Sequence, residues 1–479
     1  MIFHPGDAII NKVPLAVERA DRIPSQRYYD REFFEREKQH LWPHVWQMAC
    51  RLEEVPRPGD FIVYRILDKS VIVVRTDGNT LRAYENHCRH RGAELVQTQG
   101  HTSGGFICPF HGWRWDVSGK NTFVFEPETF STENMCNADL NLISVRIETW
   151  GGCAFINFDQ DAPSLRESIE PFASQMDAFK PEELKVDWWL SARLPCNWKL
   201  AMEAFMEGYH VATTHPQLLP PGTTNRPGES RYLPMPEEFK ITSLWLTHGT
   251  QPMPETIPSR VITEMNVESL AVLNHGMAGM THQQEVDIAR SLIDMELPPQ
   301  PLAANKAFRA ALNDAIMAHY EKMGSPTGDL NVIDAQGMSN SVNFCFPHYF
   351  LLPMFGSASS YRIRPTGPEE CLFELWSLTR FPKDVERPRP QPPKPLEHDD
   401  PTWPPIPKQD FSNLPKQQRG LHSENFKFMR LSQEMEGLIS NYNRLIDGYM
   451  ADCANDKLTT AVQKVNGPID VPVVALELG

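Results

Sequence analysis

The fold is decided by the stretch Cys88-Arg89-His90-Arg91-Gly92 and, after a spacer, by Cys108-Pro109-Phe110-His111-Gly112-Trp113. Each part pairs a cysteine with a histidine, as C-x-H in the first and as C-x2-H in the second. Together the two parts supply two thiolates and two imidazoles. Most structural zinc sites instead begin with a C-x2-4-C pair, so this spacing does not fit them.

This ligand set, in this order, is the one that a Rieske [2Fe–2S] cluster uses, because two His replace two Cys on one of its irons. We therefore predict that Cys88 and Cys108 bind one iron and that His90 and His111 bind the other. The glycine after each pair would let the loop turn tightly around a cluster. The alternatives are two structural cysteines with two surface histidines, or a zinc site.

Length and composition describe an ordinary globular protein with room for two or more domains. The net charge of −15 and the lack of a basic stripe argue against a nucleic-acid partner. No apolar run approaches the ~20 residues of a membrane span, and the N-terminus lacks the layout of a signal peptide. Nine cysteines without a framework pattern are typical of reduced residues, so we expect a cytoplasmic protein.

Periodicity divides the chain into three parts. Residues 1–44 resemble a helical lead-in, and residues 45–158 consist of short β-branched runs separated by turn signals, which predicts a small all-β domain. Residues 159–479 mix helices with three late strands and end in an amphipathic helix. We expect a helical or loop insertion near 217–335 and a Pro-rich connection at 382–407.

A second set of metal-binding residue types lies in the segment from Asn197-Trp198-Lys199 to His215. Glu207 and His210 stand three residues apart, which places them on one face of a predicted helix from Asn197 to His210. Two His with a carboxylate from elsewhere form the facial triad of non-haem Fe(II) oxygenases, which leaves positions open for O₂. A pair of structural histidines is the alternative.

With both motifs in this order and at this separation, the chain resembles the catalytic α subunit of a Rieske non-haem iron, ring-hydroxylating oxygenase. The N-W-K opening of the second segment matches as well. The resemblance implies an α+β protein, with an all-β Rieske domain ahead of a helix-grip catalytic domain. It also implies a homotrimer in which the cluster of one subunit serves the iron of the next, with or without a β subunit.

The resemblance also implies roles for individual residues. Asp410 would be the third iron ligand beside His210 and His215, because the segment Asp410 to Leu421 resembles the one that supplies it in the family. A helix N-cap is the alternative role for this aspartate, and Asp447 or Asp452 would then replace it as ligand. Glu207 would join a cluster histidine of the neighbouring subunit to an iron histidine by accepting a hydrogen bond from each.

Two departures from the family pattern bear on the substrate. Many aromatic dihydroxylases have Asp where this chain has Glu207, and Ala204 replaces a frequent Asn. Both resemble the branch that oxidises quaternary ammonium compounds. Apolar residues near the iron segment and on the late strands are candidates for the substrate pocket, namely Phe205, Met206, Phe344, Phe346, Phe350 and Phe355.

The expected function is that of a terminal oxygenase component. It would use O₂ and electrons from a separate NAD(P)H-linked reductase or ferredoxin to hydroxylate an aromatic or other hydrophobic ring. Oxidation of a quaternary amine and demethylation are alternatives, and an electron carrier without mononuclear iron is a further one. Basic residues beside the cluster motif could steer an acidic redox partner, namely Arg89, Arg91, Arg114 and Lys120.

Overall fold

The computed structural model describes residue 9 and residues 11–135, 137–218, 256, 258–277, 279–339 and 341–479. Packing divides the chain into two compact units. The β unit contains Glu35–Ser168 together with Arg387–Pro392. The mixed unit contains the described residues within Met1–Phe34, Ile169–Glu386 and Pro393–Gly479. The expected domain limits of 45 and 158 lie inside the β unit.

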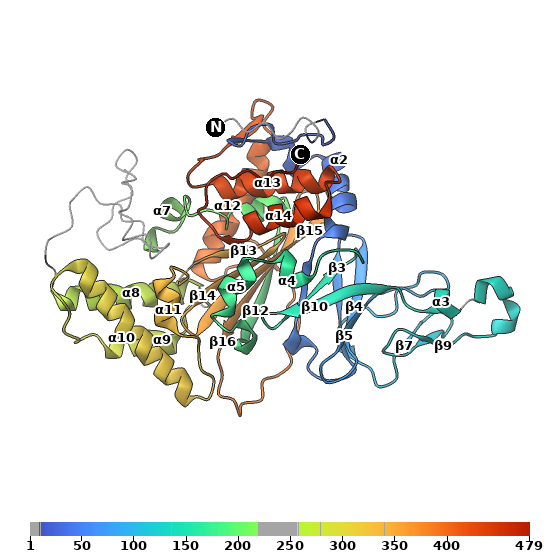
Figure 1. Cartoon of the computed structure of the whole chain (residues 1–479), viewed down its shortest axis with the longest axis horizontal. Coiled ribbons are helices and arrows are strands. Elements are labelled where there is room, and N and C mark those ends of the chain that lie inside the picture. Colours follow the sequence, from blue (N-terminus) through green and yellow to red (C-terminus); the bar gives the residue numbers. More distant parts are fainter. Residues whose placement is uncertain are drawn as a thin grey trace. The chain divides into compact units, whose positions relative to one another are not determined.

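A seven-stranded antiparallel sheet forms the larger part of the β unit (Figure 1). Its spatial order is β2 (Gln47–Arg51), β11 (Cys153–Asn157), β10 (Ser144–Trp150), β5 (Leu81–Glu85), β4 (Lys69–Arg75), β3 (Asp60–Ile66) and β6 (Gly100–His101). The β-branched run Val71–Val74 is fully buried in β4, as expected of a central strand. Asp77 closes the turn between β4 and β5, because its carboxylate accepts hydrogen bonds from the backbone N–H groups of Asn79 and Thr80.

A smaller three-stranded sheet in the same unit contains β7 (Phe106–Ile107), β8 (Arg114–Trp115) and β9 (Asn121–Phe123). The first Cys-His loop lies between β5 and β6, and the second joins β7 to β8. Cys88 and Cys108 belong to one hydrophobic cluster with Trp113 and Trp115. Both loops are therefore anchored by their cysteines in the same hydrophobic cluster.

A short piece of the Pro-rich connection completes the β unit. The guanidinium of Arg389 donates hydrogen bonds to three backbone carbonyls, those of Glu54 (2.7 Å), Gly100 (3.0 Å) and Phe61 (2.8 Å). One of the carbonyls belongs to β6, which follows the first Cys-His loop. This part of the connection is therefore fixed by contact with the unit.

The mixed unit is built on a second seven-stranded sheet. Its order is β17 (Leu396–Glu397), β12 (Lys185–Leu194), β16 (Glu370–Thr379), β15 (Ser357–Gly367), β14 (Tyr349–Met354), β13 (Asn343–Cys345) and β19 (Gly467–Pro468). Only β17 pairs in parallel, and the remaining pairs are antiparallel. A separate two-stranded ladder joins β1 (Arg22–Pro24) to β18 (Phe428–Arg430).

Helices of the mixed unit pack against this sheet and against one another (Figure 1). Helix α6 (Trp198–Glu203) contacts β15 and β16, and α12 (Pro405–Leu421) contacts α6 and β12. The C-terminal helices are α13 (Gly437–Met450) and α14 (Asn455–Val465). The shorter helices before the iron segment are α2 (Arg31–Arg36), which spans the division between the units, α4 (Leu165–Ser168) at the end of the β unit, and α5 (Phe172–Asp177) in the mixed unit.

The expected insertion contains four described helices. They are α8 (Ser259–Met277), α9 (Gln283–Ser291), α10 (Pro301–Lys322) and α11 (Leu330–Ala335). Glu285 of α9 joins this group to the sheet, because its carboxylate accepts hydrogen bonds from Gly356 N–H and from the hydroxyl groups of Ser357 and Tyr320. The Pro-rich part at 219–255 lies outside the described residues.

The prediction of one helix from Asn197 to His210 is wrong. Helix α6 ends at Glu203, an irregular turn follows, and α7 (Val211–Thr214) begins after His210. The N–H groups of Phe205 and Met206 bond only three residues back, to Met202 and Glu203, which tightens the last turn and ends the helix. Glu207 and His210 are therefore brought together by a turn and not by a helical face.

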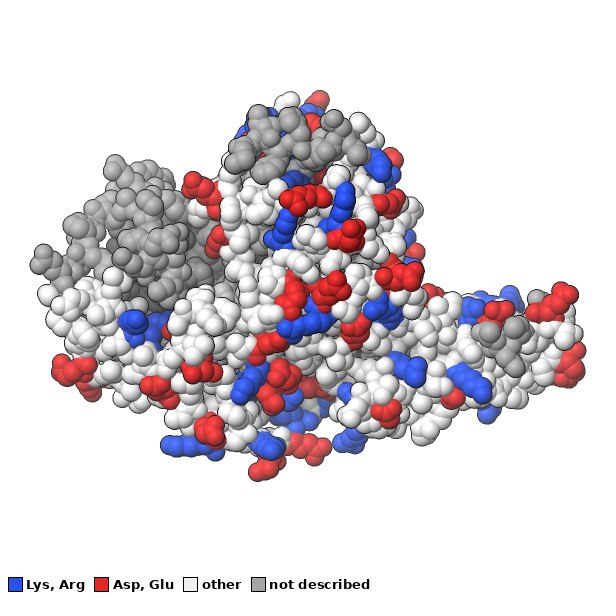
Figure 2. Space-filling view, viewed as in Figure 1, with Lys and Arg blue, Asp and Glu red and all other residues white. Residues whose placement is uncertain are grey.

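No helix in the described part of the chain is long and apolar enough to cross a membrane. Basic and acidic side chains are interspersed over the face shown in Figure 2. No stripe of one sign stands out among the described residues of that face.

Candidate metal centres

The two Cys-His loops have the same backbone conformation. In the first, the N–H of Cys88 donates to the carbonyl of Ala93 (2.8 Å) and the N–H of Gly92 donates to the carbonyl of Cys88 (3.0 Å). The second loop repeats both bonds in the pairs Cys108–Trp113 (2.8 Å) and Gly112–Cys108 (3.1 Å). The two glycines have φ angles of +77° and +71°, which favour glycine.

The four side chains of these loops suit a shared metal cluster. Both cysteines are buried, and the rings of His90 and His111 lie 4.7 Å apart between centroids. Nδ1 of His90 is buried and has no hydrogen-bond partner among the described residues. Such an atom needs a partner, and a metal ion would supply one. The ring of His90 also stacks on Trp113 at 5.0 Å, which fixes its plane.

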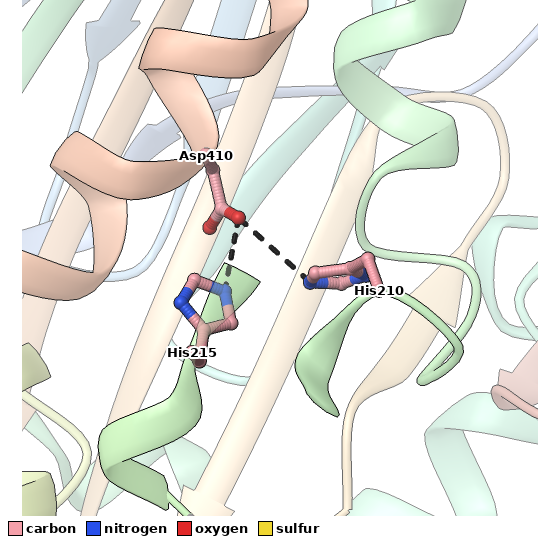
Figure 3. Close-up of side chains that lie close together, drawn as sticks. All are labelled: His210, His215 and Asp410. Atoms are coloured by element: carbon pink, nitrogen blue, oxygen red, sulfur yellow. Dashed lines mark ion pairs between the residues drawn. The ribbon is translucent and has the colours of Figure 1, made fainter. Parts of the chain in front are cut away.

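Three further candidate ligands converge in the mixed unit (Figure 3). Oδ1 of Asp410 lies 3.0 Å from Nε2 of His215 and 3.7 Å from Nε2 of His210. One ligand atom from each of the three residues lies within 4.8 Å of the others. His210 comes from the turn after α6, His215 follows α7, and Asp410 projects from inside α12. The donor set of two imidazoles and one carboxylate suits Fe(II).

Two neighbouring side chains orient the histidines. Nδ1 of His210 lies 2.8 Å from Oε1 of Glu207, and Nδ1 of His215 lies 2.7 Å from the amide oxygen of Gln409. Each contact uses Nδ1 and leaves Nε2 directed at Asp410. Burial disfavours protonation of His210, but the hydrogen bond and the charge of Glu207 outweigh this and raise its pKa.

A cavity of about 540 Å³ lies beside the triad. Its wall includes Glu207, His210 and Asp410, and it also includes Glu203 and Glu436. Apolar side chains form much of the remaining wall, namely Leu200, Leu414, Leu421, Phe426, Met429, Leu431 and Ile439. His210 and Asp410, two of the three triad residues, therefore face a space that is large enough to hold several water molecules.

Glu203 connects this cavity to a buried hydrogen-bond network. Its carboxylate accepts hydrogen bonds from the hydroxyl of Tyr28 (2.7 Å) and from the amide of Asn443 (2.8 Å). Burial raises the pKa of Glu203 to about 7, against the two hydrogen bonds and the nearby cations Lys199 and Arg27. Its carboxyl group therefore changes its charge close to neutral pH.

The six predicted pocket residues lie elsewhere in the mixed unit. The Phe205 ring packs against Phe350 (6.1 Å between centroids), Tyr361 (5.0 Å) and Phe373 (5.3 Å). The others are buried near the same sheet, namely Met206, Phe344, Phe346 and Phe355. None of the six lines the cavity of about 540 Å³. Their contact with substrate stays a prediction.

Sequence reasoning missed three residues around the triad. Gln409 adjoins Asp410, so its position next to a predicted ligand was an available signal. Glu203 lies four residues before Glu207, in the segment that also contains His210, but its partners come from distant parts of the chain. Tyr361 packs its ring against Phe205 (5.0 Å between centroids), and burial and then the charge of Asp410 raise its pKa.

The predicted docking residues of the β unit include two arginines that cover exposed aromatic rings. Arg91 lies 5.7 Å above the ring of Phe110, and Arg114 lies 5.1 Å above the ring of Phe123. Phe110 is 61% exposed, which is unusual for a phenylalanine. Cations and exposed rings therefore occur together beside the second Cys-His loop.

Two family descriptions match the sequence. Residues 45–130 match the Rieske [2Fe-2S] domain, and residues 181–452 match the ring hydroxylating alpha subunit (catalytic domain). The second match covers more than half of the chain.

Two curated relatives illustrate the range of similar proteins. The carnitine monooxygenase oxygenase subunit of Escherichia coli is 29% identical over 204 residues, which are 42% of this chain and 53% of that protein. The biphenyl 2,3-dioxygenase subunit alpha of Rhodococcus jostii is 29% identical over 246 residues, which are 49% of this chain and 52% of that protein. The chain thus matches about half the length of these relatives.

Solved structures share the fold over most of the chain. A naphthalene 1,2-dioxygenase mutant bound to phenanthrene has a TM-score of 0.61 and 18% identity, covering 97% of this chain and all of that one (100%). A quaternary ammonium Rieske monooxygenase bound to L-carnitine has a TM-score of 0.57 and 16% identity, covering 91% and 99%. At these identities the likeness concerns the fold alone.

Proposed function

Because the chain belongs to the family of ring-hydroxylating alpha subunits, we propose that it is the terminal oxygenase of a multicomponent Rieske system. It uses O₂ and electrons from a separate NAD(P)H-linked reductase, with or without a ferredoxin, to hydroxylate an organic substrate. The observation that carries this proposal is the convergence of His210, His215 and Asp410 in a chain that also has paired Cys-His loops.

Seven residues are the proposed ligands of the two metal groups. Cys88, His90, Cys108 and His111 hold the [2Fe–2S] cluster, and His210, His215 and Asp410 hold the mononuclear iron. When bound, the cluster supplies single electrons, and the mononuclear iron supplies open positions at which O₂ is activated.

Glu207 and Gln409 orient the rings of His210 and His215 and determine which ring nitrogen carries the proton. Glu207 accepts the Nδ1 proton of His210 as a hydrogen bond and keeps Nε2 free for the metal. Gln409 does the same for His215. A carboxylate has lone pairs to spare, so Glu207 can also accept an N–H from a cluster histidine of a second subunit. Glu207 is thus the inter-subunit electron bridge in this proposal.

Two substrate classes are considered. Aromatic or other hydrophobic rings are favoured by the packed rings around Phe205, which offer apolar and edge-to-face contacts. Quaternary amines, or demethylation, are favoured by Glu207 and Ala204 and by similarity to carnitine and glycine betaine monooxygenases. Aromatic faces also attract quaternary ammonium groups, so the rings themselves are compatible with both.

We propose a homotrimer of this chain in the cytoplasm, with or without a β subunit. The electron donor is an acidic ferredoxin or a flavin reductase that docks beside the second Cys-His loop. The contacts of Arg91 and Arg114 with exposed rings support a docking surface there, since cations steer an acidic partner and rings give it area to bury. Aromatic catabolism is the process that fits the first substrate class.

Metal and sulfide analysis of the purified protein tests the proposal. One cluster and one mononuclear site predict about three irons and two acid-labile sulfides per chain, by count. His210→Ala should lower iron to about two per chain and leave sulfide unchanged. Two irons in the wild type, unchanged by His210→Ala, would instead indicate an electron carrier without mononuclear iron. Oxygen uptake with a reductase, measured with biphenyl, naphthalene and L-carnitine, then separates the substrate classes.

A further inference from the structure

Glu203 is a buried acid that the proposed function does not use. Only 5% of the residue is exposed, yet it lines the same cavity as Glu207, His210 and Asp410. A buried titratable group that faces a functional cavity is more often found at active sites than elsewhere in a protein. Its position therefore calls for a role beyond packing.

The partners of Glu203 allow both protonation states. The hydrogen-bond donors are neutral, namely the Tyr28 hydroxyl and the Asn443 amide. A hydroxyl can donate to a carboxylate and can also accept from a carboxylic acid, so Tyr28 can follow a change of charge. A carboxylate locked by a bidentate arginine would lack this freedom.

Charged groups surround Glu203 on several elements. On its own helix, Lys199 is buried with its ammonium 5.3 Å from the rings of Tyr28 and Phe33 and 5.7 Å from that of Trp198. Arg27 is paired with Asp447 of α13. The charged groups that share the cavity wall are Glu207, His210, Asp410, Arg430 and Glu436. Burial outweighs the two cations, and the pKa of Glu203 is raised to about 7.

The proposed reaction consumes protons at a buried place. Dihydroxylation adds one O₂, two electrons and two protons to the substrate. Monohydroxylation uses the same reactants and releases one water. The electrons come from the reductase, but the protons must cross the protein to the triad. Water in a cavity of about 540 Å³ can carry them, provided that a nearby acid donates.

We propose that Glu203 is a proton-relay residue, whose carboxyl group releases protons into the cavity that it shares with His210 and Asp410 and regains them from solvent. This inference rests on the proposed function. Each released proton ends in the hydroxylated product or in water, and each O–H bond broken at Glu203 is formed again from a solvent proton. Glu203 supplies no electrons and forms no bond to the substrate.

Three variants separate a relay from a packing role. Glu203→Gln keeps the shape and removes the proton, and Glu203→Asp keeps a carboxyl group. Tyr28→Phe removes a hydrogen bond to the charged form, which raises the pKa of Glu203 further. Glu285→Gln is the matched control, because burial raises the pKa of that glutamate to about 7 as well and it does not line the cavity.

Cluster absorbance and iron content are measured first, to show that each variant folds and loads. Turnover and hydrogen peroxide release are then followed from pH 6 to 9 with biphenyl, naphthalene and L-carnitine. We expect Glu203→Gln to lose turnover by about 100-fold, with Glu203→Asp restoring part of it. Tyr28→Phe should move the pH profile to higher pH, and Glu285→Gln should leave turnover and profile as in the wild type.

An infrared titration of metal-free protein gives a readout without activity. Protonated carboxyl absorbance should fall near pH 7 in the wild type, and this fall should be smaller in Glu203→Gln and absent when Glu203→Gln is combined with Glu285→Gln, because both glutamates have a pKa raised to about 7. The relay is overturned if Glu203→Gln turns over within twofold of an active wild type with the same pH profile. If Glu203→Gln fails to fold, an unshifted profile in Tyr28→Phe overturns it. If the wild type consumes no O₂ with biphenyl, naphthalene or L-carnitine, the proposed function is contradicted. The infrared titration then decides separately whether Glu203 exchanges a proton.

Discussion

The Nδ1 atom of His210 lies 2.8 Å from Oε1 of Glu207, and the other carboxylate oxygen accepts the backbone N–H of the same histidine at 3.0 Å. Glu207 thus binds His210 at both its ring and its backbone. This double contact fixes the ring at the end of the irregular turn between α6 and α7. A change at Glu207 therefore affects both the position of His210 and any electron path through it.

Replacing Glu207 with Gln should abolish turnover while leaving the cluster spectrum intact. The amide keeps one acceptor oxygen, but its NH₂ group faces a donor, so one of the two contacts with His210 is lost. We expect a loss of at least about 100-fold in the rate at which O₂ reoxidises the reduced cluster, measured by stopped-flow absorbance. Near-normal turnover in this variant would remove Glu207 from the electron path.

Gln409→Leu should weaken binding of the mononuclear iron. The variant removes the amide oxygen that holds Nδ1 of His215, and partners of this kind typically contribute about 10–100-fold in metal affinity. Competition with a chelator measures the affinity in apo protein reloaded with Fe(II). Gln417→Leu is the control, because Gln417 lies on the same helix and lines the cavity without contacting either histidine. Equal affinities in the two variants would contradict the assigned role.

Substitutions at Asp410 and Asp447 should have opposite effects on iron content and on folding stability. Asp410→Ala should lose the mononuclear iron and keep its folded stability, because its carboxylate contacts the two histidines. Asp447→Asn should keep the iron and lose stability by about 3–5 kcal/mol, since it breaks a buried ion pair with Arg27. Iron analysis and urea unfolding distinguish the two. Loss of iron from Asp447→Asn at full stability would reverse the assignment.

The contribution of Glu285 to the stability of the mixed unit should fall as pH rises from 5 to 8. Burial raises the pKa of Glu285 from 4.5 to about 7, so the folded state binds more protons than the unfolded state between those values. The stabilising contribution of Glu285 is fully present below pH 4.5, and it is lost as pH rises through 7. Its full size is about 3 kcal/mol.

Glu285→Gln should reduce that pH dependence, although its absolute stability also changes because a donor replaces one acceptor oxygen. The slope of the unfolding free energy against pH, taken from urea titrations at several pH values, is therefore the relevant measurement. Glu203 adds a slope of the same sign, so some dependence should remain in the variant. A slope identical to that of the wild type would show that Glu285 titrates normally.

The Cys-His loops were predictable because their information is local. Four ligands and two glycines occur within 25 consecutive residues, from Cys88 to Gly112, and the backbone bonds that shape each loop span at most five residues. The family resemblance then implied Asp410, which lies far along the chain from the histidines. Periodicity could not have found it, since nothing in the pattern of α12 marks one buried aspartate as a ligand.

The turn that contains Glu207 and His210 was not predictable from local propensity. The residues from Leu200 to Phe205 favour a helix, and nothing in their pattern marks Glu203 as its end. The turn is stabilised by long-range contacts, such as the hydrogen bond from Gly208 N–H to Asp470, which lies 262 residues away. The network of Glu203 is similar, because Tyr28 and Asn443 lie 175 and 240 residues from it.

The three hydrogen bonds of Arg389 have a consequence for dissecting the protein. A fragment cut at the ends of the continuous part of the β unit, Glu35 and Ser168, would leave this arginine behind. The carbonyls of Glu54, Phe61 and Gly100 would then lose their charged donor, and the segments they belong to would be the first to fray. We expect such a fragment to bind its cluster less tightly. Adding a synthetic peptide of residues 387–392 should restore cluster binding, so this segment is suited to fragment complementation.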